Sequence, residues 1–353
     1  MLKKTRLSSE LEGAFNHRKL KPAEADKLRA IAENYQQRQK VRWSTNEIQL
    51  YHYYFGFLTS LKAKAVAEEL AQFSYLSAGA NYEIVDVGAG TLGGSLGILD
   101  AAPELGFSVD RILAIDPQEE ALRWAKETHP ESFQNKRKRI QVQSMVYPPH
   151  EMEDRHRIVL FANVLTEVFD LDPTSSKVHP LVAWAEKAFA QTSGKTLFVF
   201  IEPADFDFNQ VFLKWRDRWS KQIRVLLPCP HQKACPALQQ NEWCHEEREY
   251  EAPSSFWNMI RDLGYRKRNL SFSYLVLGKR PPLATAQNAR VVSSDVSGKG
   301  LCERWLCADG KRWKQSQLLR NKTDANAAFF DSSRGDMINL GILENLDTPR
   351  GAQ

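Results

Sequence analysis

Five short apolar runs alternate with helical segments in the middle of this chain, and this alternation limits the fold more than any other feature. Each run is rich in Ile, Val, Leu or Phe, as buried strands are. The runs are Tyr82–Val87, Arg111–Asp116, Arg139–Gln143, Arg157–Ala162 and Thr196–Ile201. Segments with helical spacing, Glu119–Thr128 and Pro180–Gln191, lie between some of them. The alternation predicts an α/β fold with a doubly wound parallel sheet.

The N-terminal part of the chain has the composition of helices. Pro22–Arg38 is rich in Ala, Glu, Lys and Gln, which favour a helix, and a proline suits its first turn. Thr45–Phe73 carries Leu and aromatic residues at helical spacing, which predicts a surface packed on the core. We therefore expect residues 1–75 to form a helical region that precedes the sheet.

Two later runs, Ile223–Leu227 and Ser271–Leu277, can supply the last strands of the sheet. After Arg280 the sequence alternates turn residues with short polar and apolar stretches, which favours a small β-rich unit. The predicted organisation in chain order is a helical region (1–75), a Rossmann-like domain (76–280) with a cysteine-rich insertion (228–246), a β-rich appendage (281–338) and a loose tail (339–353).

A glycine-rich loop follows the first apolar run. It reads Asp86-Val-Gly88-Ala-Gly90, and a helical pattern begins soon after it. Glycines allow the backbone to turn tightly and to approach a ligand closely. Asp116 ends the second run, where an acid can accept hydrogen bonds from ribose hydroxyls, and Asn163 follows the fourth run, beside the same crevice. We therefore expect these residues to bind a nucleotide-type cofactor.

Two classes of cofactor suit such a loop. A dinucleotide would place its pyrophosphate at the helix N-terminus, whereas S-adenosylmethionine has no phosphate and carries a sulfonium cation. Asp86, two residues before the first glycine, favours the methyl donor. The order of acid, glycines and second acid resembles that of class I methyltransferases, which implies S-adenosylmethionine. A loop that no longer binds a ligand is the alternative, because a fold does not determine a function.

The sequence leaves the catalytic residue unassigned. After Asn163 the chain lacks the Pro-Pro-aromatic motif of methyltransferases that act on base nitrogens, and no cysteine is placed to methylate a pyrimidine carbon. Glu202 ends the fifth apolar run. At that position it would either orient a substrate or anchor a loop.

Cysteines are absent from the first 228 residues and then cluster. Cys229, Cys235 and Cys244 lie within sixteen residues, next to Pro and His. Packing does not explain this clustering, because core cysteines scatter with the rest of the core, so we expect a thiolate site for a metal or an iron–sulfur cluster. Cys302 and Cys307 are the candidates for a fourth ligand.

The spacing of these cysteines bears on the kind of metal. Structural zinc sites usually pair cysteines about two to four residues apart, and that pairing is absent here. A cubane iron–sulfur cluster needs four thiolates and tolerates irregular spacing, so a [4Fe-4S] cluster is favoured. Zinc is the alternative, with His231 and His245 as additional ligands. Buried or incidental cysteines are the remaining interpretation.

Composition restricts the partners and the compartment. The chain is 42% hydrophobic and 26% charged, has no apolar run long enough to span a bilayer and shows no apolar signal segment at its N-terminus. Five cysteines in 353 residues argue against a disulfide scaffold. We therefore expect a cytoplasmic protein that is a monomer and has no membrane contact.

The net charge of +5 is unevenly distributed. Basic residues gather in four stretches, at 19–42, 135–139, 266–268 and 311–314. Mild basicity of this kind fits contact with nucleic acid, where neutralisation of phosphates drives binding. Solvated surface charge is the alternative for each stretch.

Taken together, the motifs resemble one family, the methyltransferase-like proteins of the small ribosomal subunit, bacterial and mitochondrial, which in mitochondria act as assembly factors. The matching elements run in order over about residues 80–310. They are Asp86–Gly90, Asn163–Glu167, Ile201–Pro203, Pro228–His231, Cys235–Pro236, Trp243–His245, Phe272–Tyr274 and Cys307–Gly310. The series of cysteine motifs is the specific part of the resemblance.

The resemblance implies a Rossmann-like class I S-adenosylmethionine-dependent methyltransferase fold. It also implies a [4Fe-4S] cluster bound by Cys229, Cys235, Cys244 and Cys307, and it leaves Cys302 unused. The implied partner is the rRNA of the small ribosomal subunit or of its precursor, which places the chain in ribosome biogenesis and translation. Two functions stay open: an rRNA methyltransferase, and a non-catalytic rRNA-binding assembly factor whose cluster is structural or redox-sensing.

Overall fold

The computed structural model describes residues 4–15, 18–37, 43–128, 139–143, 155–168, 179–265, 269–281, 288–296 and 298–344. The basic stretch at 266–268 lies outside these ranges, as do residues 135–138 of the second stretch and residues 345–353 of the expected tail. None of the helices within the described ranges is long and apolar enough to cross a membrane.

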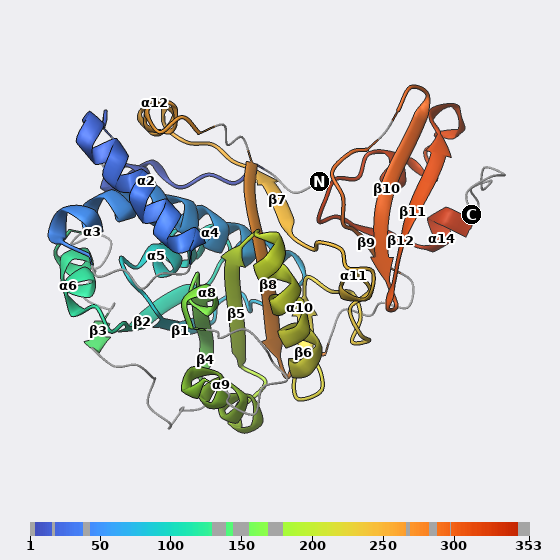
Figure 1. Cartoon of the computed structure of the whole chain (residues 1–353). Coiled ribbons are helices and arrows are strands. Elements are labelled where there is room, and N and C mark those ends of the chain that lie inside the picture. Colours follow the sequence, from blue (N-terminus) through green and yellow to red (C-terminus); the bar gives the residue numbers. More distant parts are fainter. Residues whose placement is uncertain are drawn as a thin grey trace.

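A mostly parallel sheet of eight strands forms the centre of the molecule (Figure 1). The strands are β1 (Asn81–Val87), β2 (Ser108–Ile115), β3 (Arg139–Gln143), β4 (His156–Ala162), β5 (Thr196–Pro203), β6 (Arg224–Leu227), β7 (Glu246–Glu249) and β8 (Asn269–Gly278). Seven of them lie in the order β3-β2-β1-β4-β5-β8-β6, and β7 also pairs with β8. Strand β8 runs antiparallel to β5, β6 and β7, whereas the strands from β3 to β5 are parallel to one another.

This strand order confirms the predicted fold class. One antiparallel strand, inserted next to the last in a doubly wound sheet, is the arrangement of class I methyltransferases. The order reverses between β1 and β4, and doubly wound sheets bind ligands in the crevice at the carboxyl ends of the strands at such a point. The glycine loop follows β1 and therefore lies at this crevice.

The predicted apolar runs agree with the observed strands to within three residues at every end. Strand β7 was not predicted, because its sequence Glu-Glu-Arg-Glu contains no apolar residue. It forms because its backbone pairs with β8. Two of its side chains, Glu246 and Arg248, are buried in ion pairs, which replaces the apolar burial that usually marks a strand.

Helices cover both faces of this sheet (Figure 1). They are α5 (Gly93–Ala101), α6 (Glu119–Thr128), α8 (Leu165–Val168), α9 (Pro180–Gln191), α10 (Phe206–Trp219) and α12 (Ser254–Asp262), and the short helix α11 (Pro236–Gln239) packs on α10 instead of on the sheet. α5 and α12 share one hydrophobic core with β1 and β8, and α9 and α10 share a second core on the other face. Burial of these two apolar layers is the main force that holds the domain together.

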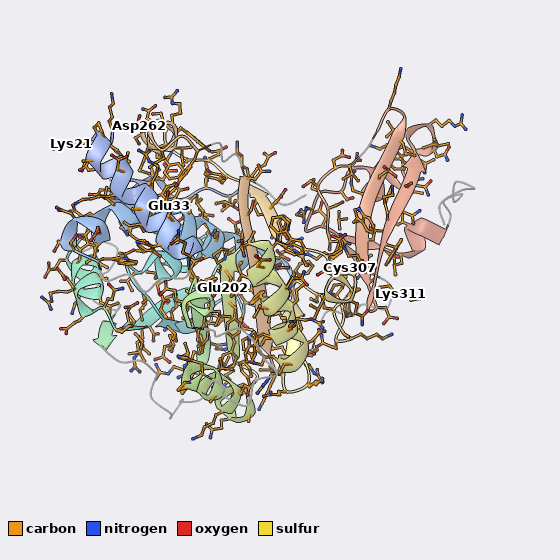
Figure 2. The ribbon with its side chains drawn as sticks, in the orientation of Figure 1. Lys21, Glu33, Glu202, Asp262, Cys307 and Lys311 are labelled. Atoms are coloured by element: carbon orange, nitrogen blue, oxygen red, sulfur yellow. The ribbon has the colours of Figure 1, made fainter. Side chains whose placement is uncertain are left out.

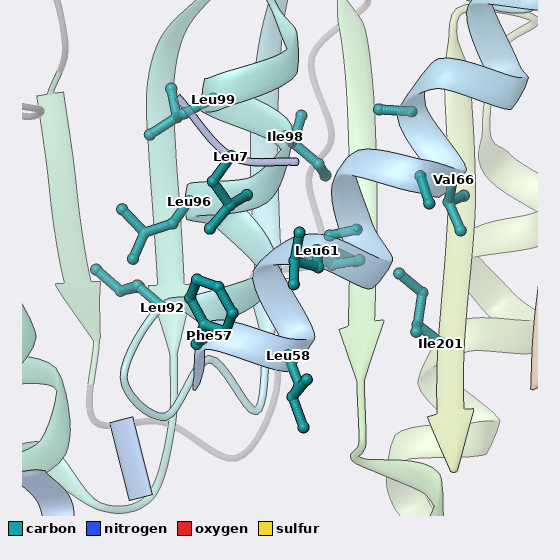
Figure 3. Packing of buried hydrophobic residues seen from close by; sticks show 14 of the residues in the cluster. Leu7, Phe57, Leu58, Leu61, Val66, Leu92, Leu96, Ile98, Leu99 and Ile201 are labelled. Atoms are coloured by element: carbon teal, nitrogen blue, oxygen red, sulfur yellow. The ribbon is translucent and has the colours of Figure 1, made fainter. Parts of the chain in front are cut away.

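N-terminal helices complete the first layer. They are α1 (Ser9–Ala14), α2 (Pro22–Gln36), α3 (Thr45–Tyr51) and α4 (Phe57–Gln72), with one stretch of π-helix, η1 (His52–Gly56), between α3 and α4. The helix predicted at Thr45–Phe73 is thus present, but its π turn was not predicted. Figure 3 shows Phe57 and Leu61 of α4 packed beside Leu96 of α5.

α4 lies unusually close to α5. A Cβ at Gly93 would stand 2.8 Å from the Gly56 carbonyl oxygen, and a Cβ at Gly97 would overlap the backbone of Ser60. The Ser60 hydroxyl donates to the Gly93 carbonyl over 2.8 Å. Glycine is therefore required for this contact, which presses the N-terminal helix onto the segment that follows the glycine loop.

A second, antiparallel sheet forms the C-terminal part and stands to one side of the first (Figure 1). Its strands are β9 (Asn288–Val291), β10 (Leu301–Ala308), β11 (Lys311–Leu318) and β12 (Met337–Asn339), accompanied by η2 (Leu319–Asn321), α13 (Ala327–Phe330) and α14 (Gly341–Glu344). Val291, Leu306 and Phe329 are fully buried in a small core of its own. The strand order is β11-β10-β9-β12.

A cluster of buried charges joins the two sheets. Arg290 of β9 pairs with Glu69 of α4 at 2.6 Å and with Glu246 of β7 at 2.7 Å. Arg248 also pairs with Glu69, and the Tyr274 hydroxyl accepts a hydrogen bond from Arg290. Because every member is buried, each charge depends on the others for its solvation.

Candidate cofactor and thiolate sites

The glycine loop between β1 and α5 has a tight backbone. Gly88 and Gly90 have φ angles of +69° and +48°, in the left-handed region that glycine adopts without strain. The Gly88 N–H donates to the Ile115 carbonyl over 2.8 Å, which ties the loop to the end of β2. A Cβ at Gly88 would lie 2.5 Å from a Val164 methyl group, so the chain that follows β4 packs directly on the loop.

Two buried carboxylates flank the loop. Burial raises the pKa of Asp86 to about 6, and the nearby Asp116 adds to this shift. The Ser95 hydroxyl donates to Asp86 over 2.6 Å. Asp116 accepts hydrogen bonds from the N–H groups of Gly90 at 2.8 Å and Gln118 at 2.7 Å. Asp116 therefore shapes the loop itself, and each of its oxygens keeps a lone pair for a ribose hydroxyl.

Residues of the N-terminal helices close the crevice from above the loop. Tyr51, Gly56 and Thr59 line a cavity of about 20 Å³ together with Asp86 and the loop glycines. One water needs about 10–15 Å³, so the cavity holds little more than a single water. The Asn163 side-chain amide donates to the Thr59 hydroxyl over 3.0 Å, which ties the end of β4 to α4.

Thr91 gives the clearest sign that this cavity suits a polar ligand. Its side chain is 1% exposed and lines the cavity. Among the residues that the structure describes, none bonds its hydroxyl. A buried hydroxyl without a partner is costly, since it has given up its hydrogen bonds to water. One acid for a cation, one acid for a ribose and one buried hydroxyl together fit the chemistry of S-adenosylmethionine.

Glu202, at the end of β5, anchors a loop. Its carboxylate accepts hydrogen bonds from the backbone N–H groups of Val164 at 3.1 Å and Leu165 at 2.9 Å, just after β4. Burial raises the pKa of Glu202 to about 8, against the effect of these N–H donors. Figure 2 shows Glu202 within the central domain. Of the two roles that the sequence left open, the structure supports the loop anchor.

Four of the five cysteines gather where the two sheets meet. Cys229, Cys244 and Cys307 line one cavity of about 40 Å³, and Cys235 packs with Leu213 beside it. Burial raises the pKa of Cys235 to about 12, and the Cys244 and Cys229 thiols add to that shift. Burial and the same neighbours also raise the pKa of Cys307, which Figure 2 places at the end of the second sheet nearest the central domain.

Side chains of α10 hold the cysteine segment in place. Arg216 is 1% exposed and donates to two backbone carbonyl groups of the loop before Cys235, over 2.5 and 2.7 Å. Asp217 accepts from the Cys235 N–H at 3.0 Å. Asn209 donates to the Cys244 carbonyl over 2.6 Å and accepts from its N–H over 3.0 Å. The backbone on both sides of the cavity is thus held from one helix.

The thiols surround the cavity without standing at coordination distances. Within the described ranges, no group of three or more His, Cys, Asp or Glu side chains is arranged to hold a metal ion. The His231 Nε2 lies 3.5 Å from the Cys307 sulfur, and burial lowers the pKa of His231 to about 4, which keeps the ring neutral. Three thiols that line one cavity, a fourth thiol beside it and a neutral imidazole near Cys307 are the donor types that zinc or an iron–sulfur cluster takes.

The comparisons with known proteins agree with the resemblance seen in the motifs. A family model described as "Mitochondrial small ribosomal subunit Rsm22" matches residues 58–338. The chain belongs to the Rsm22 family. The matched span includes the glycine loop, Glu202 and all five cysteines of this Rsm22-family chain. A comparison with curated proteins gave no match.

Solved structures similar to this Rsm22-family chain include methyltransferases. One is a precorrin-6y C5,15-methyltransferase of Geobacter metallireducens, with 9% identity, a TM-score of 0.35, and coverage of 62% of this chain and 89% of that chain. Another is an S-adenosylmethionine-dependent methyltransferase of Geobacter sulfurreducens in complex with S-adenosyl-L-homocysteine, with 12% identity, a TM-score of 0.34, and coverage of 61% and 90%. At these scores the assignment of the fold rests on the strand order alone.

Several residues of these sites were not predicted from the sequence of this Rsm22-family chain. Tyr51 and Thr59 reach the glycine loop from helices that the sequence marked only as core-facing. Arg216 and Asn209 hold the cysteine segment from α10, and their spacing gives no sign of that contact. Of these residues, only Thr91 could have been found from the sequence, because it lies inside the glycine motif.

Proposed function

We propose that this chain is a methyltransferase-like protein of the small ribosomal subunit that binds S-adenosylmethionine and acts on or binds rRNA during assembly of the subunit. The observation that carries the proposal is the family match over residues 58–338, whose description names the mitochondrial small ribosomal subunit. The basic strand β11, with Lys311 and Lys314 exposed, is one surface suited to rRNA phosphates.

S-adenosylmethionine would supply the methyl group at the crevice between β1 and β4. Asp86 would face a cationic group of the cofactor, and Asp116 would accept from ribose hydroxyls, while the Thr91 hydroxyl would gain the partner that it lacks among the described residues. Gly88 and Gly90 allow the backbone to approach the ligand, and Asn163 borders the same crevice.

Isothermal titration of the purified full-length chain with S-adenosylmethionine tests this part of the proposal. We expect saturable binding that Asp116→Ala weakens at least tenfold, because the ribose and the loop both lose a partner. Asp26→Ala is the matched control, since Asp26 is an exposed acid on α2, far along the chain from the loop. No heat from the wild-type chain at any accessible concentration would count against the cofactor.

A [4Fe-4S] cluster at Cys229, Cys235, Cys244 and Cys307 is the second part of the proposal. Its support is the cavity that Cys229, Cys244 and Cys307 share, with Cys235 beside it, and the hydrogen bonds from α10 that hold the backbone of the cysteine segment. The four thiolate ligands would link the cysteine-rich insertion, which follows β6, with strand β10. They would thereby attach the second sheet to the first. Iron and acid-labile sulfide in the anaerobically purified chain should each be about four per chain. Stoichiometric zinc without sulfide would show that the site binds zinc and not an iron–sulfur cluster.

One observation favours a non-catalytic assembly factor as the second candidate. Within the described ranges the polar groups at the ends of β4 and β5 are engaged: Asn163 bonds Thr59, and Glu202 bonds the backbone after β4. Incubation of the chain with small-subunit rRNA, its precursor particles and radiolabelled S-adenosylmethionine separates the two functions. Transfer of label to rRNA indicates an enzyme, whereas co-sedimentation without transfer indicates an assembly factor.

The cellular compartment and the oligomeric state expected from the sequence remain predictions. The cytoplasmic placement expected from the sequence contrasts with the family description, which names a mitochondrial protein. Fractionation of source cells into cytosol and mitochondria decides between them. The monomeric state is tested by light scattering of the purified chain, for which we expect a mass close to 40.4 kDa.

A further inference from the structure

Tyr51 lines the glycine-loop cavity although it belongs to α3, a helix outside the matched span 58–338. In a regular α-helix, residues five positions apart point in clearly different directions. The π turn changes this, because the Phe57 N–H bonds the His52 carbonyl, five residues earlier. As a result Tyr51 and Gly56 both face the loop. A π turn inside a helix often marks a functional position.

Tyr51 is the middle ring of an aromatic stack at the edge of this cavity. Its ring centroid lies 4.2 Å from that of Trp43 with an angle of 29°, and 5.1 Å from that of Phe55 with an angle of 24°. All three side chains are half-buried. With both faces stacked, the edge of the Tyr51 ring is the part that can border the loop, and a ring edge is suited to an edge-to-face contact with an adenine ring.

The cavity is too small for the cofactor as the helices stand. Its volume is about 20 Å³, so one of its walls must move before S-adenosylmethionine binds. α4 is an unsuitable mover, because Gly97 of α5 is in direct backbone contact with Ser60 of α4, while Gly93 contacts Gly56 at the end of the π turn. α3 is the alternative. Its Ile48 and Leu50 are buried, and two polar contacts hold its N-terminal end: the Trp43 N–H, just before the helix, donates to Gln118 over 3.4 Å, and the Thr45 hydroxyl donates to the exposed Glu120 over 2.7 Å.

We infer that Tyr51 is a cofactor-binding residue, and that α3 moves outward about the π turn at His52–Gly56 to admit S-adenosylmethionine and then returns. Because the two faces of the Tyr51 ring lie against Trp43 and Phe55, the edge of the ring borders the bound cofactor. This inference rests on the proposed cofactor site. It adds to that site a residue, Tyr51, that lies outside the span matched by the family model.

Titration with S-adenosylhomocysteine, a ligand that does not turn over, tests the inference. We expect Tyr51→Ala to weaken binding about tenfold or more, and Tyr51→Phe to keep it within about twofold, because the ring and not the hydroxyl makes the contact. Tyr250→Ala is the matched control. Tyr250 also contacts a tryptophan, Trp257, with ring centroids 5.2 Å apart and the rings tilted by 33°, but it does not line the glycine-loop cavity, so this variant should bind as the wild type does.

Hydrogen exchange read by mass spectrometry tests the motion. Without ligand, residues 45–56 should exchange faster than residues 57–72, and saturating S-adenosylhomocysteine should slow the exchange of 45–56. If the wild type binds while Tyr51→Ala binds equally well, or while 45–56 shows no change in exchange, the inference is overturned and the cofactor site stands. If the wild type binds neither S-adenosylhomocysteine nor S-adenosylmethionine, the inference and the proposed cofactor fail together.

Discussion

Cys302 and Cys307 belong to the same strand, β10, and lie on opposite faces of it. Burial alternates along the strand, with Cys302 in the buried set and Cys307 in the half-buried set. Side chains alternate between the two faces of a strand, so an odd separation of five residues places them on opposite sides. Cys302 packs in the core of the second sheet, whereas Cys307 lines the cavity of the thiols and contacts His231.

This relationship predicts different effects for two single substitutions. Cys307→Ser should lose most of the iron and sulfide of the purified chain, because a hydroxyl is a poor replacement for a thiolate ligand. Cys302→Ser should keep the metal and cost about 1–3 kcal/mol of stability, since it buries a hydroxyl in an apolar core. Iron and sulfide analysis together with thermal unfolding of both variants checks this. Equal loss of iron from the two variants would contradict the assignment of Cys307.

Asp86 predicts how cofactor affinity depends on pH. Its pKa is raised to about 6 by burial, so the carboxyl is mostly ionised at pH 7.5 and mostly protonated at pH 5. If the ionised form holds a cationic group of S-adenosylmethionine, affinity should be full above about pH 7 and fall up to about tenfold per unit below pH 6. Titrations between pH 5 and pH 8 measure this.

Asp86→Asn is the control for this pH dependence. The amide is nearly isosteric and cannot ionise, so the variant should bind weakly at every pH and show a flat profile over the same range. A wild-type affinity that is constant from pH 5 to pH 8, or an Asp86→Asn variant with the wild-type profile, would contradict the role of the ionised carboxyl.

The sequence predicts the central sheet well, because each buried strand carries its own run of apolar residues. The run at Thr196–Ile201 is apolar on both faces, as parallel strands under helices must be, and the run at Tyr82–Val87 carries apolar residues on both faces beside Glu83 and Asp86, so their positions follow from composition. The glycine loop is equally local. Its positions Gly88 and Gly90 adopt the left-handed backbone that the motif requires. For the thiols, clustering in the sequence indicates a site, and the fold brings Cys229, Cys244 and Cys307 to one cavity with Cys235 beside it.

The parts that the sequence does not predict depend on contacts between distant segments. Strand β7 is buried through ion pairs of Glu246 and Arg248 with residues far away in the chain, so its own sequence resembles a solvated turn. The position of Tyr51 depends on a single π turn, which no spacing rule in the helix indicates. Glu202 had two plausible roles, and only the nearby N–H groups of Val164 and Leu165 distinguish them.

The close contact at Gly97 predicts that Gly97→Ala lowers the stability of the protein. In Gly97→Ala the new methyl group would overlap the backbone of Ser60, so α4 and α5 must separate. Forced overpacking of this kind costs about 1–3 kcal/mol, and it should also weaken the cofactor site that α4 covers. Gly13→Ala is the matched control, because Gly13 is also helical and has open space around it. Urea unfolding should show Gly13→Ala to be neutral or slightly stabilising, and equal costs for both variants would contradict the close contact.

The ion pairs of Arg290 predict that the attachment of the second sheet to the first depends on this one buried charge. In Arg290→Met, Arg248 becomes the one cation within the described cluster that pairs with the buried Glu69 and Glu246, and the loss of Arg290 costs about 3–5 kcal/mol. We expect lower stability in urea and faster proteolytic removal of residues 288–344 than in the wild type. Lys322→Ala is the control, because Lys322 pairs with Asp331 on the surface and should cost less than about 1 kcal/mol. A variant Arg290→Met as stable and as protease-resistant as Lys322→Ala would show that the sheets are held together by other contacts.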